Sequence, residues 1–379
     1  MKPRSLLPIL GLMSLRPASA PLRVFIAAAI ILSAACSRDT SRTVFLGAAG
    51  PIGSAVGDAN MKGFELALDE LNAAQGRSYK FDKVIRNDSA RGDRAAIVAQ
   101  EFVNDPRIVA VIGHVNSGTM MAAARIYDGG RLPAVATSAT SPSLTGISSW
   151  TFRVIASDSL NGLTIASHMS KLGKRRAMIL YENNSYGRGL AESFRRGFTG
   201  EIVGMDPISD QAGEDLEPFL TWIKQKQVDL VFVAGSATSG IGFLEEARRQ
   251  QIAAALVGGN GWTVFATDPV AEGAYFPTPF NAGDPRPDVQ AFVRSYRARY
   301  GETPNAYAAL AYDATKIVAQ AIDRVGPDRG KVRDYLAHLD APYVGVTGST
   351  VFGENGDPKD KPMVMMKIHD RALIPESAQ

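Results

Sequence analysis

The chain has 379 residues, of which 45% are hydrophobic and 21% charged, a composition typical of a globular protein. It contains 41 Lys and Arg against 38 Asp and Glu, a net charge of +3. Four of the basic residues and none of the acidic ones fall within residues 1–35, so the remainder has 37 basic and 38 acidic residues and a net charge of −1. This balance argues against binding to nucleic acid or to a membrane surface. The single cysteine, Cys36, leaves no partner for an internal disulfide.

An apolar run precedes Cys36. Val24–Leu32 is apolar, basic residues come before it, and small residues separate it from the cysteine. This order is typical of a secretory signal peptide, and the run is much shorter than the ~20 residues that span a bilayer. We therefore predict a signal peptide over residues 1–35, starting at Met1 or Met13. A cysteine at the cleavage point resembles the lipobox of bacterial lipoproteins, which implies lipidation of Cys36; the alternative is a plain signal peptide and an unmodified cysteine.

Residues 36–42 are short and mostly polar, and we interpret them as a tether between the lipid and the fold. About 340 residues follow Cys36. A single hydrophobic core stops growing at ~250–300 residues, so two domains are expected.

Strand-like and helix-like segments alternate from Val44 onward. In Ala59–Ala73, for example, Phe64, Leu68 and Leu71 recur at helical spacing. A Gly-rich loop is expected over Gly47–Gly57. In chain order, the first series of strands is predicted at Val44–Leu46, Phe81–Ile85, Val109–Ile112 and Ala134–Ala136, and its helices at Ala59–Ala73, Asp93–Asn104 and Met120–Tyr127.

A second series of the same kind follows. Two successive series of this type predict an α/β fold with two doubly wound sheets, one in each of two lobes. The second series has strands at Ala177–Tyr181, Leu230–Ala234 and Ala255–Gly258, and helices at Gly189–Phe198, Leu216–Lys226 and Gly242–Gln250.

Loops rich in small hydroxyl residues follow two neighbouring strands. Val109–Ile112 leads into Gly113–Thr119, and Ala134–Ala136 leads into Thr137–Pro142. Ligands of open α/β sheets bind outside the carboxyl ends of the strands. Free N–H groups at a helix N-terminus, with hydroxyls beside them, form a neutral cradle for an anion such as a carboxylate. Helix capping alone explains any one Ser or Thr, but it does not explain the same chemistry after two adjacent strands.

These two loops, VIGHVNSGTM (Val111–Met120) and VATSATSPSLTG (Val135–Gly146), resemble the paired ligand loops of the branched-chain amino-acid binding family. These are the type I periplasmic solute-binding proteins of ABC importers. The resemblance runs through Gly63–Gly76, Asn183–Gly197 and other segments, and covers nearly all of the chain from residue 44 to about residue 357. It implies two α/β lobes joined by a three-segment hinge.

The resemblance also implies the residues that bind a ligand carboxylate. Ser117 corresponds to the hydroxyl that donates to the carboxylate. Ser138, Ala139 and Thr140 match the segment that binds both the carboxylate and the amine, with Ser138 as a departure from the family pattern.

Four further positions carry implied roles. Tyr186 matches an aromatic residue that swings in from lobe two, Tyr307 one that lines the pocket from lobe one, and Asp158 an acid at the hinge. Either tyrosine could instead close a hydrophobic core. Asn260 stands where amino-acid binders carry a glutamate for the ligand ammonium. A charge-assisted hydrogen bond contributes roughly 1.5–3 kcal/mol against ~0.5–1.5 for a neutral one, so the implied pocket is less selective for cations, although Asp158 leaves amino acids open.

The function that the resemblance implies is delivery of an amino acid, or a related small carboxylate or amide, to an ABC permease by hinge closure. We expect a monomer outside the cytoplasm, in the periplasm or at the cell surface, anchored through Cys36. No cofactor, metal, catalytic residue or nucleic acid is expected. Lobe one is predicted over residues 43–157 and 281–342, and lobe two over residues 158–280 and 343–379.

Two other functions stay open. The same fold could serve as a ligand sensor or as a lipoprotein regulator of a cell-envelope enzyme, although two hydroxyl-rich loops favour a small ligand. An extracellular hydrolase using Ser117 is the other alternative, but the four histidines are scattered and form neither a zinc motif nor a triad. His114, beside the first loop, is expected to pack or cap rather than to bind a ligand.

Overall fold

The computed structural model describes residues 42–209, 213, 215–361 and 363–376. The predicted signal peptide, the lipidation site Cys36 and nearly all of the predicted tether lie outside these residues. The last tether residue, Arg42, is the first residue of strand β1 (Arg42–Gly50). None of the helices in the described ranges is long and apolar enough to cross a membrane.

Five parallel strands form the first sheet in the order β2-β1-β3-β4-β5. Strands β3 and β4 are buried at every residue, as the centre of a parallel sheet covered on both faces requires. Apart from β1, the strands are β2 (Tyr79–Asn87), β3 (Ile108–Ile112), β4 (Ala134–Ala136) and β5 (Thr151–Arg153).

The predicted loop over Gly47–Gly57 is wrong in extent. Strand β1 continues to Gly50, and helix α2 already begins at Ala55. A Cβ atom at Gly47 would lie 3.2 Å from Val111 and 3.3 Å from Phe102, so this glycine serves close packing inside the sheet. A glycine that allows close approach and a glycine that makes a turn look the same in a sequence.

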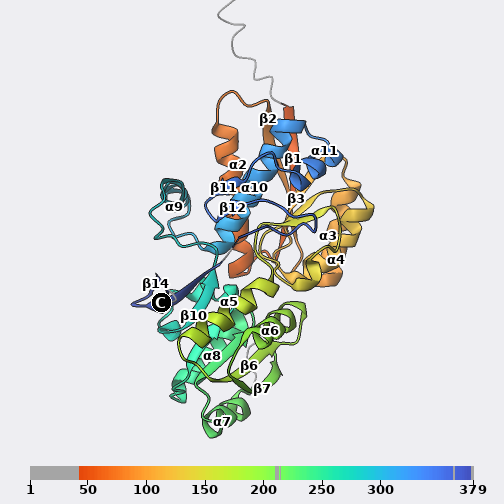
Figure 1. Ribbon diagram of the computed structural model, residues 1–379. Coiled ribbons are helices and arrows are strands. Elements are labelled where there is room, and N and C mark those ends of the chain that lie inside the picture. Colours follow the sequence, from red (N-terminus) through yellow and green to blue (C-terminus); the bar gives the residue numbers. More distant parts are fainter. Residues whose placement is uncertain (1–41, 210–212, 214, 362, 377–379) are drawn as a thin grey trace, which may run out of the picture. The chain divides into compact units, whose positions relative to one another are not determined.

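Helices cover both faces of the first sheet (Figure 1). Phe64 of α2 and Ile317 of α10 share one core cluster with β3, whereas Phe102 of α3 and Met120 of α4 share another. Gly63 in α2 permits the closest approach, because a Cβ there would overlap the backbone of α10. These helices are α2 (Ala55–Ala73), α10 (Ala306–Val325) and α11 (Arg329–Ala337) on one face, and α3 (Gly92–Asn104) and α4 (Ser117–Gly129) on the other.

The second sheet has seven strands in the order β14-β13-β10-β9-β8-β6-β7. Five of its strands are parallel: β6, β7, β8, β9 and β10. Strands β13 and β14 add an antiparallel edge beside β10. The bounds are β6 (Arg176–Glu182), β7 (Glu201–Ile208), β8 (Leu230–Ala234), β9 (Ala255–Gly258), β10 (Tyr275–Thr278), β13 (Val364–His369) and β14 (Ala372–Pro375).

Two pairs of helices enclose the second sheet in the same way. Met169 of α5 and Phe194 of α6 pack in one core cluster, and Leu220 of α7 and Phe243 of α8 in another. The helices are α5 (Asp158–Lys171), α6 (Ser185–Gly197), α7 (Glu217–Gln225) and α8 (Ala237–Arg249).

The chain passes between the two sheets three times. It leaves the first sheet after β5, returns after β10 through α9 (Pro287–Tyr300), and enters the second sheet again at β13 after the ribbon β11 (Tyr343–Gly345) and β12 (Gly348–Thr350). The predicted α/β fold with two doubly wound sheets is confirmed. The predicted lobe boundaries stay a prediction.

Candidate functional site

A cavity of about 420 Å³ lies where loops from both sheets meet. Its volume is in the range of small-molecule sites, roughly 300–1,000 Å³. The loops that follow β1 and β3 line it from the first sheet, and those that follow β6, β8 and β9 line it from the second. Five of the eight predicted ligand residues are in its wall: Ser117, Ser138, Tyr186, Asn260 and Tyr307.

Other cavities are as large but lack this convergence of strand ends. One of about 510 Å³ lies beside α7 and α8, and one of about 620 Å³ lies beside Trp150 and Arg333. Because ligands of α/β sheets bind beyond the carboxyl ends of the strands, position rather than volume makes the 420 Å³ cavity the candidate site.

The first turn of α4 presents unpaired donors to the cavity. Among the described residues, no acceptor faces the backbone N–H groups of Ser117, Gly118 and Thr119, and all three residues line the cavity. The N-cap residue Asn116 makes no capping bond through its side chain. Unpaired N–H groups and the positive end of the helix dipole favour an anion at this point.

The Ser117 hydroxyl connects the two predicted loops. Its oxygen accepts the N–H groups of Thr140 at 3.2 Å and Ser141 at 3.1 Å, so the hydroxyl proton is left to donate. Ser138 differs, because its hydroxyl donates to the Val115 carbonyl at 2.9 Å. The Ser138 hydroxyl can therefore accept a hydrogen bond from a ligand but has no proton left to donate to one.

Three predicted ligand residues do not line the cavity. Ala139, Thr140 and Asp158 are buried behind the wall, and the Asp158 N–H donates to the Thr140 carbonyl at 2.8 Å. Burial raises the pKa of Asp158 to about 7, although the Thr140 hydroxyl, the Asn161 amide and the charge of Arg153 act against it. Ligand contacts through these three residues stay a prediction.

Two tyrosines and Asn260 form a further part of the wall. Tyr186 stands at the start of α6, and its hydroxyl donates to Asn260 Oδ1 at 3.4 Å. Tyr307 stands at the start of α10 and also packs against Val115. Burial raises the pKa of each tyrosine well above its usual range, so both present neutral hydroxyl groups.

Glu182 is a cavity residue that the sequence reasoning missed. It is the last residue of β6 and is 2% exposed. Its carboxylate accepts the Ser236 N–H at 2.8 Å, the hydroxyls of Ser236 and Ser239, and the Asn184 side chain at 2.9 Å. The predicted strand stopped one residue earlier, at Tyr181. The rule that ligands bind beyond strand ends, applied to β6, points to it.

Arg153 is a second missed residue and holds the loop after β4 in place. It is 2% exposed, and it pairs with Asp357 through two bonds of 2.6 and 2.8 Å. The same guanidinium donates to the Ser141 carbonyl at 2.9 Å and to Thr145 at 2.7 Å. The planar fork of arginine suits such a set of acceptors.

His114 packs in the core of the first sheet and does not line the cavity. Its Nδ1 lies 2.7 Å from Asp88 Oδ2 and its Nε2 lies 3.0 Å from the Tyr127 hydroxyl, with all three side chains buried. The histidine therefore supports the loop that leads to Ser117, in keeping with its predicted packing role.

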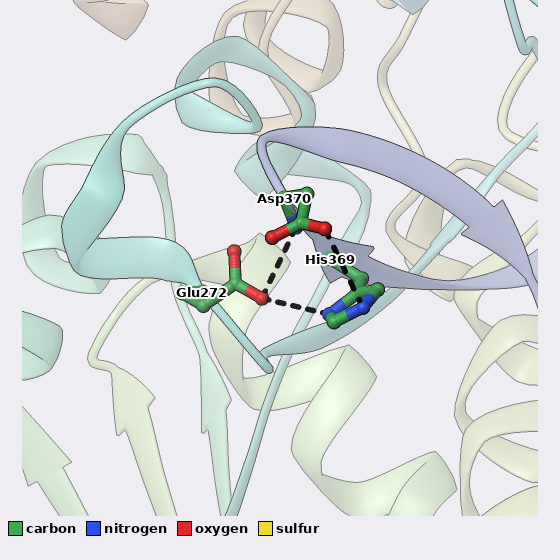
Figure 2. Close-up of side chains that lie close together, drawn as sticks. All are labelled: Glu272, His369 and Asp370. Carbon is green, nitrogen blue, oxygen red and sulfur yellow. Dashed lines mark hydrogen bonds and ion pairs between the residues drawn. The ribbon is translucent and has the colours of Figure 1, made fainter.

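A cluster of Glu272, His369 and Asp370 lies at the β13–β14 turn (Figure 2). His369 Nδ1 lies 3.1 Å from Glu272, and its Nε2 lies 3.7 Å from Asp370. The two ring nitrogens thus face different carboxylates, and one ion cannot use both contacts. Ordinary surface hydrogen bonds account for the cluster, and none of its members lines the cavity. The sequence did not indicate it, because Glu272 is 97 residues from His369.

Two doubly wound sheets whose strand-end loops share one cavity, with hydroxyl groups in its wall, have the arrangement of a two-lobe ligand-binding protein. A sequence model described as periplasmic binding protein matches residues 44–372, and the chain belongs to this family.

Individual relatives agree with this assignment. The leucine-, isoleucine-, valine-, threonine- and alanine-binding protein of Pseudomonas aeruginosa is 25% identical over 93% of this chain and 97% of its own length. The substrate-binding protein LivJ of Streptococcus pneumoniae, solved in complex with isoleucine, has a TM-score of 0.81 at 30% identity and covers 88% of this chain and 100% of its own. A substrate-binding protein of Desulfitobacterium hafniense, in complex with Leu, has a TM-score of 0.79 at 31% identity over 88% of this chain and 100% of its own.

The predicted membership of the branched-chain amino-acid binding family is therefore confirmed. Like its homologues, this chain is a solute-binding protein and not an enzyme. The family places it outside the cytoplasm.

Proposed function

We propose that this protein is the substrate-binding component of an ABC importer and that it binds an amino acid, or a related small carboxylate or amide, by hinge closure. The observation that carries the proposal is the first turn of α4. Three N–H groups without an acceptor among the described residues, together with the Ser117 hydroxyl, face a cavity of small-molecule size.

Residues from both sheets supply the physical basis for closure. Ser117 and Tyr307 reach the cavity from the first sheet, and Tyr186 and Asn260 from the second. A solute that touches both sets stabilises the closed arrangement only through the interactions that it makes in that arrangement and not in the open one. The Ser141 hydroxyl donates to the Ser185 carbonyl at 2.9 Å. This bond joins the loop after β4, in the first sheet, to the start of α6, which packs on the second sheet.

The cellular setting follows from the same proposal. The names of the relatives point to branched-chain and small amino acids as the first solutes to test. A monomer that is lipidated at Cys36 would stay near the permease it serves. The intact mass of the processed protein tests the anchor, because an unmodified Cys36 would give a mass without the diacylglycerol group.

Removal of the Ser117 hydroxyl tests the site. A hydrogen bond to a charged group contributes roughly 1.5–3 kcal/mol, so Ser117→Ala should raise the Kd of the best-bound amino acid by about 10-fold to 100-fold. Isothermal titration measures this change after a thermal-shift screen of amino acids and organic acids, in which a solute at 100 times its Kd stabilises the fold by about 2.7 kcal/mol.

Ser193→Ala is the matched control. Ser193 is buried in α6, and its hydroxyl donates to the Gly189 carbonyl, away from the cavity wall. An unchanged Kd in Ser117→Ala would refute the assigned carboxylate site. A protein that binds no small molecule but does bind a cell-envelope enzyme would instead support the regulator function.

A further inference from the structure

Glu182 is a buried carboxylate whose described partners are all neutral. Its four hydrogen bonds come from a backbone N–H group, two serine hydroxyls and one asparagine amide. Among the described residues, no Lys, Arg or His lies within ion-pair distance of it. A buried charge without an opposite charge is costly, and a cation placed beside it removes part of this cost.

The carboxylate has capacity left on one side. Three of the four bonds go to Oε1, whereas Oε2 accepts only the Asn184 side chain at 2.9 Å. A carboxylate oxygen accepts two bonds in its plane, so Oε2 can take one more donor. Glu182 is part of the cavity wall, so a solute in the cavity can supply that donor.

The negative charge of Glu182 also reaches the cavity walls. It contributes to the raised pKa of both Tyr186 and Tyr307, after the larger effect of burial. The N-termini of α6 and α8 lie near the carboxylate, and because each helix end carries about half a unit of positive charge, they offset part of its negative charge.

The two poles of the cavity come from different sheets. The first turn of α4 offers N–H groups to an anion, and Glu182 at the end of β6 offers a negative charge to a cation. We propose, on the basis of the proposed function, that Glu182 binds the protonated amine of the solute. The site then selects zwitterions over plain carboxylates even though Asn260 is neutral.

Glu182→Gln tests this assignment, because the amide keeps the size of the side chain and removes the charge. The probes are the twenty common L-amino acids, followed by titration of the best-bound one and its deaminated acid. Wild-type protein should bind the amino acid at least tenfold more tightly than the deaminated acid. The variant should lose that preference through weaker binding of the amino acid, with little change for the acid.

Two further variants separate charge from structure. Glu245→Gln removes an exposed carboxylate of α8 and should leave the preference unchanged. Ser239→Ala removes one neutral donor to Glu182, loosens its tie to α8 and keeps its charge, so the preference for the amine should persist. If Glu182 were only a structural tie, Glu182→Gln and Ser239→Ala would weaken the amino acid and the acid equally.

The outcomes distinguish this inference from the proposed function. If the deaminated acid binds wild-type protein as tightly as the amino acid, the solute site stands and the role of Glu182 is refuted. A preference that survives in Glu182→Gln refutes it as well. If neither amino acids nor their deaminated acids bind wild-type protein, both the inference and the proposed amino-acid function fall.

Discussion

Asp158 is a fully buried carboxyl at the start of α5, and its ionisation opposes folding. Its pKa is raised to about 7 in the folded protein, against about 3.9 in an unfolded chain. The folded state therefore holds one more proton between these values, and the free energy of unfolding falls as pH rises from about 4 to 7. Each pKa unit corresponds to about 1.4 kcal/mol, so the loss approaches 4 kcal/mol at most.

Asp158→Asn should remove this pH dependence, since an amide does not titrate. Urea unfolding at pH 5 and pH 8 measures it: we expect wild-type protein to lose stability between the two values and the variant to lose less. Asp206→Asn, at an exposed position on β7, is the control and should behave as wild type. Equal pH dependence in wild type and Asp158→Asn would contradict the raised pKa.

Some residues of the site could be predicted from the sequence, and others could not. Ser117 and Ser138 were predictable because hydroxyl residues after two adjacent parallel strands must meet at one sheet edge. Glu182 was not singled out, since an acid at a strand end looks like any solvated residue until the partners from α8 are known. Thr140 is buried behind the wall, where its carbonyl accepts the Asp158 N–H, and no local sequence pattern relates these two residues.

At the scale of elements, an ion pair between buried Arg153 and partly exposed Asp357 ties the loop after β4 to the turn that precedes β13. Arg153 at the end of β5 pairs with Asp357, and the Gly146 N–H donates to the Asn355 carbonyl at 3.0 Å. Helix and strand positions followed from apolar periodicity, but this tie joins residues about 200 positions apart and could not be predicted from it.

Asp357→Ala should destabilise the protein by about 3–5 kcal/mol, because it leaves the Arg153 guanidinium buried without its carboxylate. Because Arg153 also holds the Ser141 carbonyl, solute affinity should fall too. Arg153→Met combined with Asp357→Ala should recover part of the stability, since no unpaired charge remains. Chemical denaturation checks this order, and a double variant less stable than Asp357→Ala would contradict the ion-pair account.

On the scale of the whole molecule, three passages of the chain connect two sheets that jointly line one cavity. The number of sheets and the parallel pairing of their central strands were predictable from the two α/β series, whereas the antiparallel edge of β13 and β14 was not predicted. The extent of β1 was not, because its glycines serve packing rather than a turn. In the proposed function the solute contacts both sheets, which links the chemistry of α4 to the conformation that a permease would recognise.

The most direct test is a crystal structure with the amino acid that binds best. We predict its carboxylate about 3 Å from the N–H groups of Ser117, Gly118 and Thr119, and its amine on the side of Glu182. Residues after β6 and β9 should contact the same molecule from the second sheet. A solute bound outside this cavity, or a carboxylate turned away from the first turn of α4, would contradict the account.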